Sequence, residues 1–280
     1  DPNLDYILSR VRVAYEKNQR RHYCFIKNVE KQKNEEDVDF EYRVRKQEYF
    51  VKDLTRFNIK TILVDDFREI TDLLKRLEKK FKSKTVFISG AAHEYGNIGE
   101  QQALKFVYEL SKKFVSKNMR IVSGFGLGVG SSVISGALEQ TFKSPKAKLE
   151  DKLILRPFPQ STSGEISLSE LWTKYREDMI NYAGIALFLF GNKLDGEKII
   201  PSNGMREEFE IAKNNGLLLI PVGATEYATR EIYNKLSQDG YFDGAEFPKD
   251  LREHINKLAD FNSDLETIKG VLIDLLNSLK

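Results

Sequence analysis

The stretch VSGFGLGVGSS at residues 122–132 decides the fold, because it joins a strand-like segment to a helix-like one through a turn with almost no side chains. The strand-like RIVSG (120–124) leads into it, and the helix-like VISGALEQ (133–140) follows it. Four glycines occupy alternate positions, namely Gly124, Gly126, Gly128 and Gly130. A sharp turn explains some of them, because glycine adopts positive φ angles at little cost. The full set indicates that something approaches this backbone closely.

Short apolar segments alternate with helical segments on both sides of this turn, from Lys84 onward. Continuously apolar strands separated by helices are typical of a parallel sheet that is covered on both faces. We therefore predict an α/β fold, a Rossmann-like parallel sheet with helices on both faces, over residues 83–280. The predicted strands are TVFISG (85–90), RIVSG (120–124), LILRP (153–157), IALFLFG (185–191) and LLLIPVG (217–223).

Residues 1–82 predict a smaller α/β piece. Two strand candidates, RHYCFIKNV (21–29) and KTILVDD (60–66), are accompanied by helices expected from about Phe40 to Thr55 and over residues 67–81. Two strands can hardly form a parallel sheet with both faces covered. We expect this piece to be the C-terminal portion of an α/β domain whose beginning is missing.

Composition excludes several classes of function. The 44 basic and 42 acidic side chains give a net charge of +2, which is too small an excess for a long nucleic-acid groove. No apolar run approaches the roughly 20 residues of a membrane-spanning helix. One cysteine and three scattered histidines offer neither a disulfide nor a metal cluster. We expect a cytoplasmic protein that binds no metal, no nucleic acid and no membrane.

The carboxyl ends of the strands are the expected ligand site, because ligands of doubly wound sheets bind there. A glycine turn before a helix offers backbone N–H groups and the positive helix end to a phosphate. The pattern is neither a Walker loop nor the usual dinucleotide fingerprint. A purely structural turn is the alternative. The candidate residues are Ser89, Gly90 and Ala91 after the first strand, and Gly124, Gly126, Leu127, Gly128, Gly130 and Ser131 in the turn.

Two charged residues project into the apolar faces of helices. A rotation of about 100° per residue places Arg176 among Trp172 and Met179, and Glu208 among Met205 and Phe209. An inward guanidinium needs a carboxylate, a carbonyl or a ligand phosphate. We expect Arg176 to bind phosphate and Glu208 to accept hydrogen bonds from ribose hydroxyls. The alternative is a structural salt bridge between them.

Lys193 follows the apolar strand 185–191 and offers a second cation for a phosphate. Its alternative interpretation is a solvated loop lysine.

The order SGFGLGVGSSVISGALE, KYREDMINYAGIALFLFG and GMREEFEIA resembles the SLOG superfamily, the Rossmann-like group that includes the LOG-type nucleotide phosphoribohydrolases. The resemblance places Arg176 at the family's arginine position, and Glu207 with Glu208 at its glutamate pair. The long insertion FLFGNKLDGEKIIPSNGM replaces the family's compact Pro-Gly-Gly segment, and Met205 replaces its threonine. Both departures favour binding over hydrolysis.

DPNLDYILSRV, NQRRHYC and TILVDD resemble the final third of a sirtuin-like domain. Fused to a SLOG domain with ILRPFPQ, they resemble the Thoeris antiphage effectors, which are sirtuin-like NAD hydrolases. This resemblance implies that residues 83–280 sense a cyclic ADP-ribose isomer made by a TIR-domain partner enzyme. Binding then activates cleavage of the substrate NAD within a homo-oligomer, a tetramer in the full-length protein. It also implies catalytic residues upstream of Asp1 and an inactive fragment. A phosphoribohydrolase that uses Glu208, or a pure assembly module, are the alternatives.

Overall fold

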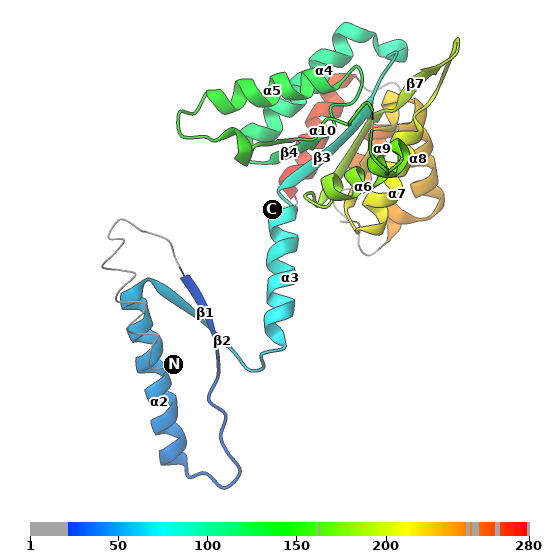
Figure 1. Cartoon of the computed structure of the whole chain (residues 1–280). Coiled ribbons are helices and arrows are strands. Elements are labelled where there is room, and N and C mark those ends of the chain that lie inside the picture. Colours follow the sequence, from blue (N-terminus) through cyan, green and yellow to red (C-terminus); the bar gives the residue numbers. More distant parts are fainter. Residues whose placement is uncertain (1–21, 162, 245–246, 248–251, 261–263, 279–280) are drawn as a thin grey trace. The chain divides into compact units, whose positions relative to one another are not determined.

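The computed structural model describes residues 22–161, 163–244, 247, 252–260 and 264–278 (Figure 1). The chain divides into two compact units, the first ending at Glu78 and the second beginning at Lys79. Each unit is described by itself. The segment DPNLDYILSRV (1–11), which carries part of the sirtuin-like resemblance, lies outside the described residues.

The first unit contains a two-stranded parallel sheet. Strand β1 (His22–Lys27) pairs with β2 (Ile59–Val64) over the whole length of both, and helix α2 (Asp37–Leu54) connects them. The helix begins three residues before the predicted Phe40, where Asp37 and Asp39 place negative charge in its first turn. Carboxylates at that position stabilise a helix because they offset its dipole.

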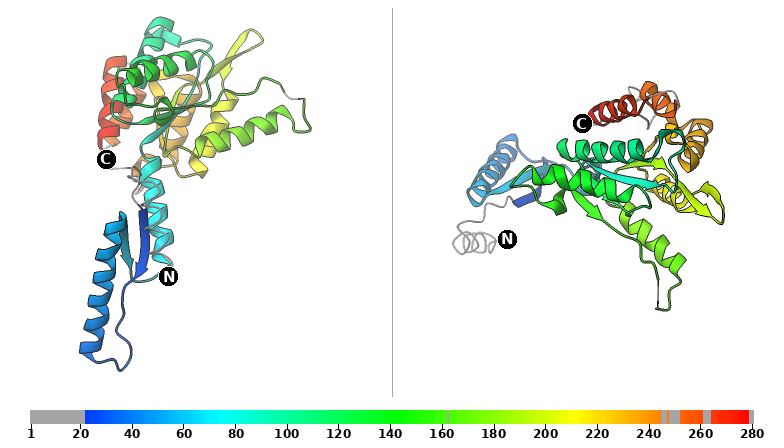
Figure 2. Two further views of the ribbon diagram at one scale, coloured as in Figure 1. Left: turned by 60° about the vertical axis from the view of Figure 1, so that its left-hand side comes forward. Right: turned by 90° about the horizontal axis from the view of Figure 1, so that it is seen from above.

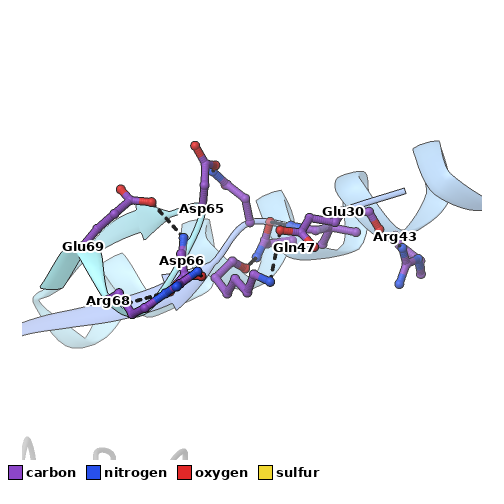
Figure 3. A network of polar contacts seen from close by, with 10 residues as sticks. Glu30, Arg43, Gln47, Asp65, Asp66, Arg68 and Glu69 are labelled. Atoms are coloured by element: carbon purple, nitrogen blue, oxygen red, sulfur yellow. Dashed lines mark hydrogen bonds and ion pairs between the residues drawn. The ribbon is translucent and has the colours of Figure 1, made fainter. Parts of the chain in front are cut away.

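Polar side-chain contacts lie at the carboxyl ends of both strands (Figure 3). Gln47 on α2 donates to the carbonyl of Lys27 at 2.6 Å and accepts from the Val29 N–H at 3.2 Å. After β2, Asp66 accepts from Arg68, and the guanidinium lowers the pKa of this carboxyl to about 2. The turns that follow both strands are therefore fixed by side chains.

Few apolar side chains of the first unit are covered. Helix α3 (Glu69–Lys82) runs on into the second unit and has no buried residue. Leu77 is 63% exposed, and Leu63 on β2 is 46% exposed. Such exposure is unusual for large aliphatic residues on an amphipathic helix or a strand.

The second unit contains the predicted parallel sheet (Figure 1). Its five strands lie in the order β5-β4-β3-β6-β9, and every neighbouring pair is parallel. The Rossmann-like prediction is confirmed. The strands are β3 (Thr85–Ala91), β4 (Arg120–Ser123), β5 (Leu153–Leu155), β6 (Ile185–Phe190) and β9 (Leu218–Pro221).

Helices cover this sheet. Right-handed crossovers place the helices that lead from β3 through β4 to β5 on one face, and those that return through β6 to β9 on the other. On the first face α4 packs against α5 and against the C-terminal α10, drawn in red in Figure 1. On the second face α6 packs against α7. The helices are α4 (Glu100–Ser116), α5 (Gly130–Phe142), α6 (Leu168–Ile180), α7 (Asn203–Asn214), α8 (Tyr227–Gln238), α9 (Arg252–Ala259) and α10 (Leu265–Ser278).

The core lies around β6, all six of whose residues are buried. The insertion after β6 is an antiparallel hairpin of β7 (Asn192–Asp195) and β8 (Lys198–Pro201), which projects from the second unit in both views of Figure 2. Among the described helices, none is long and apolar enough to cross a bilayer.

Candidate functional site

The strand order changes direction at the carboxyl end of β3. The chain leaves β3 toward β4 on one side and later returns to β6 on the other. This is the topological switch point at which ligands of doubly wound sheets bind. Ser89, Gly90 and Ala91 occupy it, as predicted.

The glycine turn lies against this end of β3. A Cβ added to Gly126 would stand 1.8 Å from the Gly90 carbonyl oxygen, and one on Gly128 would stand 2.0 Å from that of Ala92. Ala92 also donates its N–H to the carbonyl of Leu127 at 2.8 Å. The chain's own backbone therefore accounts for the close approach at these two glycines. Phosphate binding by the turn remains a prediction.

Helix α6 carries Arg176 into the interior. Ser167 caps the helix by accepting from the Glu170 N–H, and this Ser-x-x-Glu spacing is typical of a capping box. The Arg176 side chain is 11% exposed, and its NH1 lies 2.8 Å from Glu207 Oε2. Its Nε is 3.6 Å from Glu208 Oε1 and makes no hydrogen bond in the described part.

The inward projection of Arg176 and Glu208 is thus confirmed, and so is an ion pair within the fold. The closer partner of Arg176 is Glu207 rather than Glu208. Thr173 Oγ1 donates a hydrogen bond to the other carboxylate oxygen of Glu207, Oε1, at 2.5 Å. The alternative of a structural salt bridge is therefore present, because two carboxylates face the guanidinium. Phosphate binding by Arg176 stays a prediction.

Glu208 is the most deeply placed carboxylate of this cluster. Its side chain is 13% exposed, and Ser89 Oγ lies 2.5 Å from its Oε2. Burial raises the pKa of Glu208, and the contacts with Ser89 and Arg176 oppose that rise. This carboxyl accepts a proton more readily than an exposed glutamate does.

Phe158, in the loop after β5, completes the surroundings of Arg176. The guanidinium lies 4.9 Å from the centre of its ring, within reach of a cation–π interaction. A Cβ on Gly124 would stand 2.5 Å from the same ring. Trp172 on α6 holds the loop by donating to the Pro159 carbonyl at 2.7 Å. The loop follows β5, so it lies at the carboxyl ends of the strands where a ligand is expected, but no sequence pattern identified the Phe158 ring.

Asn192 fixes the loop after β3 and was missed by the sequence analysis. Its side chain is fully buried; Oδ1 accepts from the N–H groups of His93 and Glu94 at 2.8 and 3.0 Å, and Nδ2 donates to the Glu94 carbonyl at 2.8 Å. Tyr227 donates to the Glu94 carboxylate at 2.7 Å, and burial raises the pKa of this phenol. A polar residue directly after a buried strand was the only available signal.

Backbone strain gathers at this edge of the sheet. Of the seven described non-glycine residues with positive φ, three are asparagines; the others are Phe125, Phe190, Glu226 and Tyr227. Phe190 is the last residue of β6, Phe125 comes two residues after β4, and Glu226 and Tyr227 come five and six residues after β9. Such angles cost about 1–3 kcal/mol apiece and are typical of functional sites.

The structure brings most of the predicted residues together. Contacts join Ser89 to Glu208, Glu208 and Glu207 to Arg176, and Gly90 to Gly126. The Ala91 carbonyl accepts from the Gly191 N–H at 2.8 Å.

The side chains of three predicted residues take no part in these contacts among the described residues, although the Leu127 carbonyl accepts from the Ala92 N–H. Lys193 is half-buried beside Asn192, and its ammonium group makes no ion pair or hydrogen bond with a described residue. Leu127 is 63% exposed, and Ser131 is exposed at the start of α5.

Comparison with known proteins adds a family. Residues 69–279 match the Sir2- and TIR-associating SLOG family. The chain is 50% identical over 248 residues to the NAD(+) hydrolase ThsA of Bacillus cereus (strain MSX-D12), covering 88% of this chain and 51% of that protein. It is 41% identical over 245 residues to the NAD(+) hydrolase ThsA of Acinetobacter baumannii (strain 532279), covering 85% and 51%. The chain spans about half the length of these curated relatives.

Proposed function

Because the chain belongs to the Sir2- and TIR-associating SLOG family, we propose that its second unit is a nucleotide sensor. It binds a cyclic ADP-ribose isomer at the carboxyl edge of the sheet. The observation that supports this is the cluster of Arg176, Glu207, Glu208 and Ser89 beside the glycine turn.

The cluster offers complementary partners to such a ligand. Arg176 supplies a cation and a fork of donors for a phosphate, and Lys193 supplies a second cation from the hairpin. Glu207 and Glu208 accept hydrogen bonds from ribose hydroxyls. The positive end of α5 and the glycine turn face the diphosphate. Gly124, Gly126, Gly128 and Gly130 let the turn pack closely on its neighbours, since a Cβ at each would stand less than 3.0 Å from another atom of the chain.

The activity of the whole protein follows by analogy with the relatives. We assign cleavage of the substrate NAD to the part of those hydrolases that this chain does not span. Ligand binding activates NAD cleavage by favouring one arrangement of subunits in a homo-oligomer. A ligand shifts such an equilibrium only toward the arrangement that it binds more tightly. In infected cells a TIR-domain enzyme makes the signal, and NAD depletion in the cytoplasm blocks the phage.

Isothermal titration of the 280-residue chain with cyclic ADP-ribose isomers tests the sensor. We expect one isomer to bind, and Arg176→Ala to weaken its binding by about 2 kcal/mol, the contribution of a charge-assisted contact. Lys174→Ala, an exposed change on the same helix, should bind normally. If the Arg176→Ala variant bound the isomer as tightly as the parent chain, Arg176 would not be part of the binding site. Failure of every isomer to bind would refute the sensor.

A phosphoribohydrolase makes a different prediction. A buried carboxyl with a raised pKa suits acid–base chemistry, so Glu208 is also the candidate catalytic group of this rival. Steady release of adenine from AMP, abolished by Glu208→Gln, would favour the rival over the sensor.

A further inference from the structure

Two neighbouring cavities lie at the opposite end of the sheet, where β3 and β4 begin. The larger has a volume of about 660 Å³ and is lined by four lysines and, among the described residues, by no carboxylate. None of the four ammonium groups forms an ion pair or hydrogen bond with a described residue. These lysines are Lys80, Lys84, Lys113 and Lys117.

The same cavity has an apolar part. Phe114, Met119 and Ile273 contribute it, and Ser83, Asn118 and Asn277 add polar groups. Sites for small organic ligands combine an apolar wall with a few polar groups in volumes of roughly 300–1,000 Å³. The cavity therefore has the size and lining for a flat organic group that carries negative charge nearby.

The second cavity continues this basic surface. Its volume is about 470 Å³, and it shares Lys84 and Asn118 with the first. The Arg120 guanidinium lies 4.7 Å above the ring of Phe81 at its wall. Asp151 is the one carboxylate among its described lining residues, against the additional cations Arg120, Lys146, Lys148 and Lys152.

This concentration of positive charge is not a property of the whole chain. The 44 basic and 42 acidic side chains nearly cancel, yet cations far outnumber carboxylates around the two cavities. Like charges held together repel one another, and a bound polyanion would relieve that repulsion. A concave site with an apolar wall favours a small molecule over an extended nucleic acid.

We propose that the two cavities form one site for a nucleoside polyphosphate. The base packs against Phe114, Met119 and Ile273, and the phosphates extend past Lys84 into the basic second cavity. The site stands apart from the proposed sensor cluster, since it adjoins Thr85 at the start of β3, whereas Ser89 and Gly90 mark the other end of that strand.

Titration of the 280-residue chain with ATP tests the proposal. We expect saturable binding that Lys84→Glu weakens at least about tenfold, since this lysine faces both cavities. Lys148→Glu, a second variant on an exposed side chain, should also weaken it. Lys257→Glu makes the same charge change at an exposed position of α9 that lines neither cavity, and should leave the affinity within about twofold, since a distant exposed charge is screened.

Further ligands separate the remaining outcomes. Inorganic tripolyphosphate should bind more weakly than ATP, because it lacks the base. A cyclic ADP-ribose isomer that binds the sensor cluster should not displace ATP, which keeps this test independent of the sensor. The proposal is overturned if ATP fails to bind, if Lys257→Glu weakens binding as much as Lys84→Glu, or if a cyclic ADP-ribose isomer that binds the sensor cluster displaces ATP. Tripolyphosphate binding as tightly as ATP, or a DNA duplex displacing ATP at equal phosphate concentration, would also overturn it.

Discussion

Ser89 Oγ lies 2.5 Å from Glu208 Oε2, so the central strand of the sheet and helix α7 meet at one carboxylate. The other oxygen of Glu208 faces Arg176 on α6 at 3.6 Å. One strand and two helices thus converge on a single side chain. A change at any of the three residues alters the surroundings of the other two.

Arg176→Ala should destabilise the second unit. The substitution leaves Glu207 and Glu208 close together without their cation, and breaking a buried ion pair costs about 3–5 kcal/mol. Urea unfolding of the variant measures the loss. Lys174→Ala, which removes an exposed pair with Glu170, should cost less than about 0.5 kcal/mol. The double variant Arg176→Ala/Glu207→Gln should recover part of the stability. Equal stability of Arg176→Ala and the parent protein would contradict this account.

Glu208 should make the protein less stable as the pH rises. Burial raises its pKa above the ordinary value of 4.5, so the folded state holds the proton more tightly than the unfolded state does. The resulting stability is complete below the unfolded pKa and is lost as the pH rises through the folded pKa. Glu208→Gln, which cannot ionise, should remove this part of the pH dependence. Unfolding free energies from about pH 4 to about pH 8 provide the check, and parallel curves for the two proteins would count against it.

Gly126→Ala should prevent normal packing of the glycine turn on β3. The added methyl group would stand 1.8 Å from the Gly90 carbonyl oxygen, so the backbone must move. We expect a loss of about 3 kcal/mol or more in unfolding free energy. Gly270→Ala is the matched control: it lies in α10 with no described atom within 4 Å of the added carbon. That variant should gain up to about 1 kcal/mol from helix propensity. An unchanged unfolding free energy for Gly126→Ala would mean that the turn can accommodate a methyl group, contrary to this account.

Asn192→Ala should release the loop after β3. It removes three hydrogen bonds to His93 and Glu94 and leaves their backbone groups without those partners. The expected cost is about 2–3 kcal/mol, with faster hydrogen exchange at both amides. Asn203→Ala, on the exposed start of α7, serves as control. Unchanged exchange at His93 and Glu94 would show that other contacts hold the loop.

The sheet was predictable because its strands are short apolar runs set between amphipathic helices. The same helical projection identified Arg176 and Glu208 as inward-facing. It could not identify Glu207 as the closer partner, since that residue projects about 100° away and only the flexible side chain brings its carboxylate back. The role of Asn192 depends on a loop almost 100 residues earlier in the chain. Likewise, the Gly126 contact involves a strand that the sequence does not place against it.

The ion pairs that Arg176 already makes with Glu207 and Glu208 bear on which ligands the proposed sensor could accept. A free phosphate that displaces Glu207 would leave that carboxylate facing a second anion. A nucleoside without phosphate would hydrogen-bond to the carboxylates but offer the guanidinium no anionic partner. In the proposed sensor, only a molecule that presents both groups at the right separation would satisfy every member of the cluster, so the ion pair would select against compounds that carry one group alone.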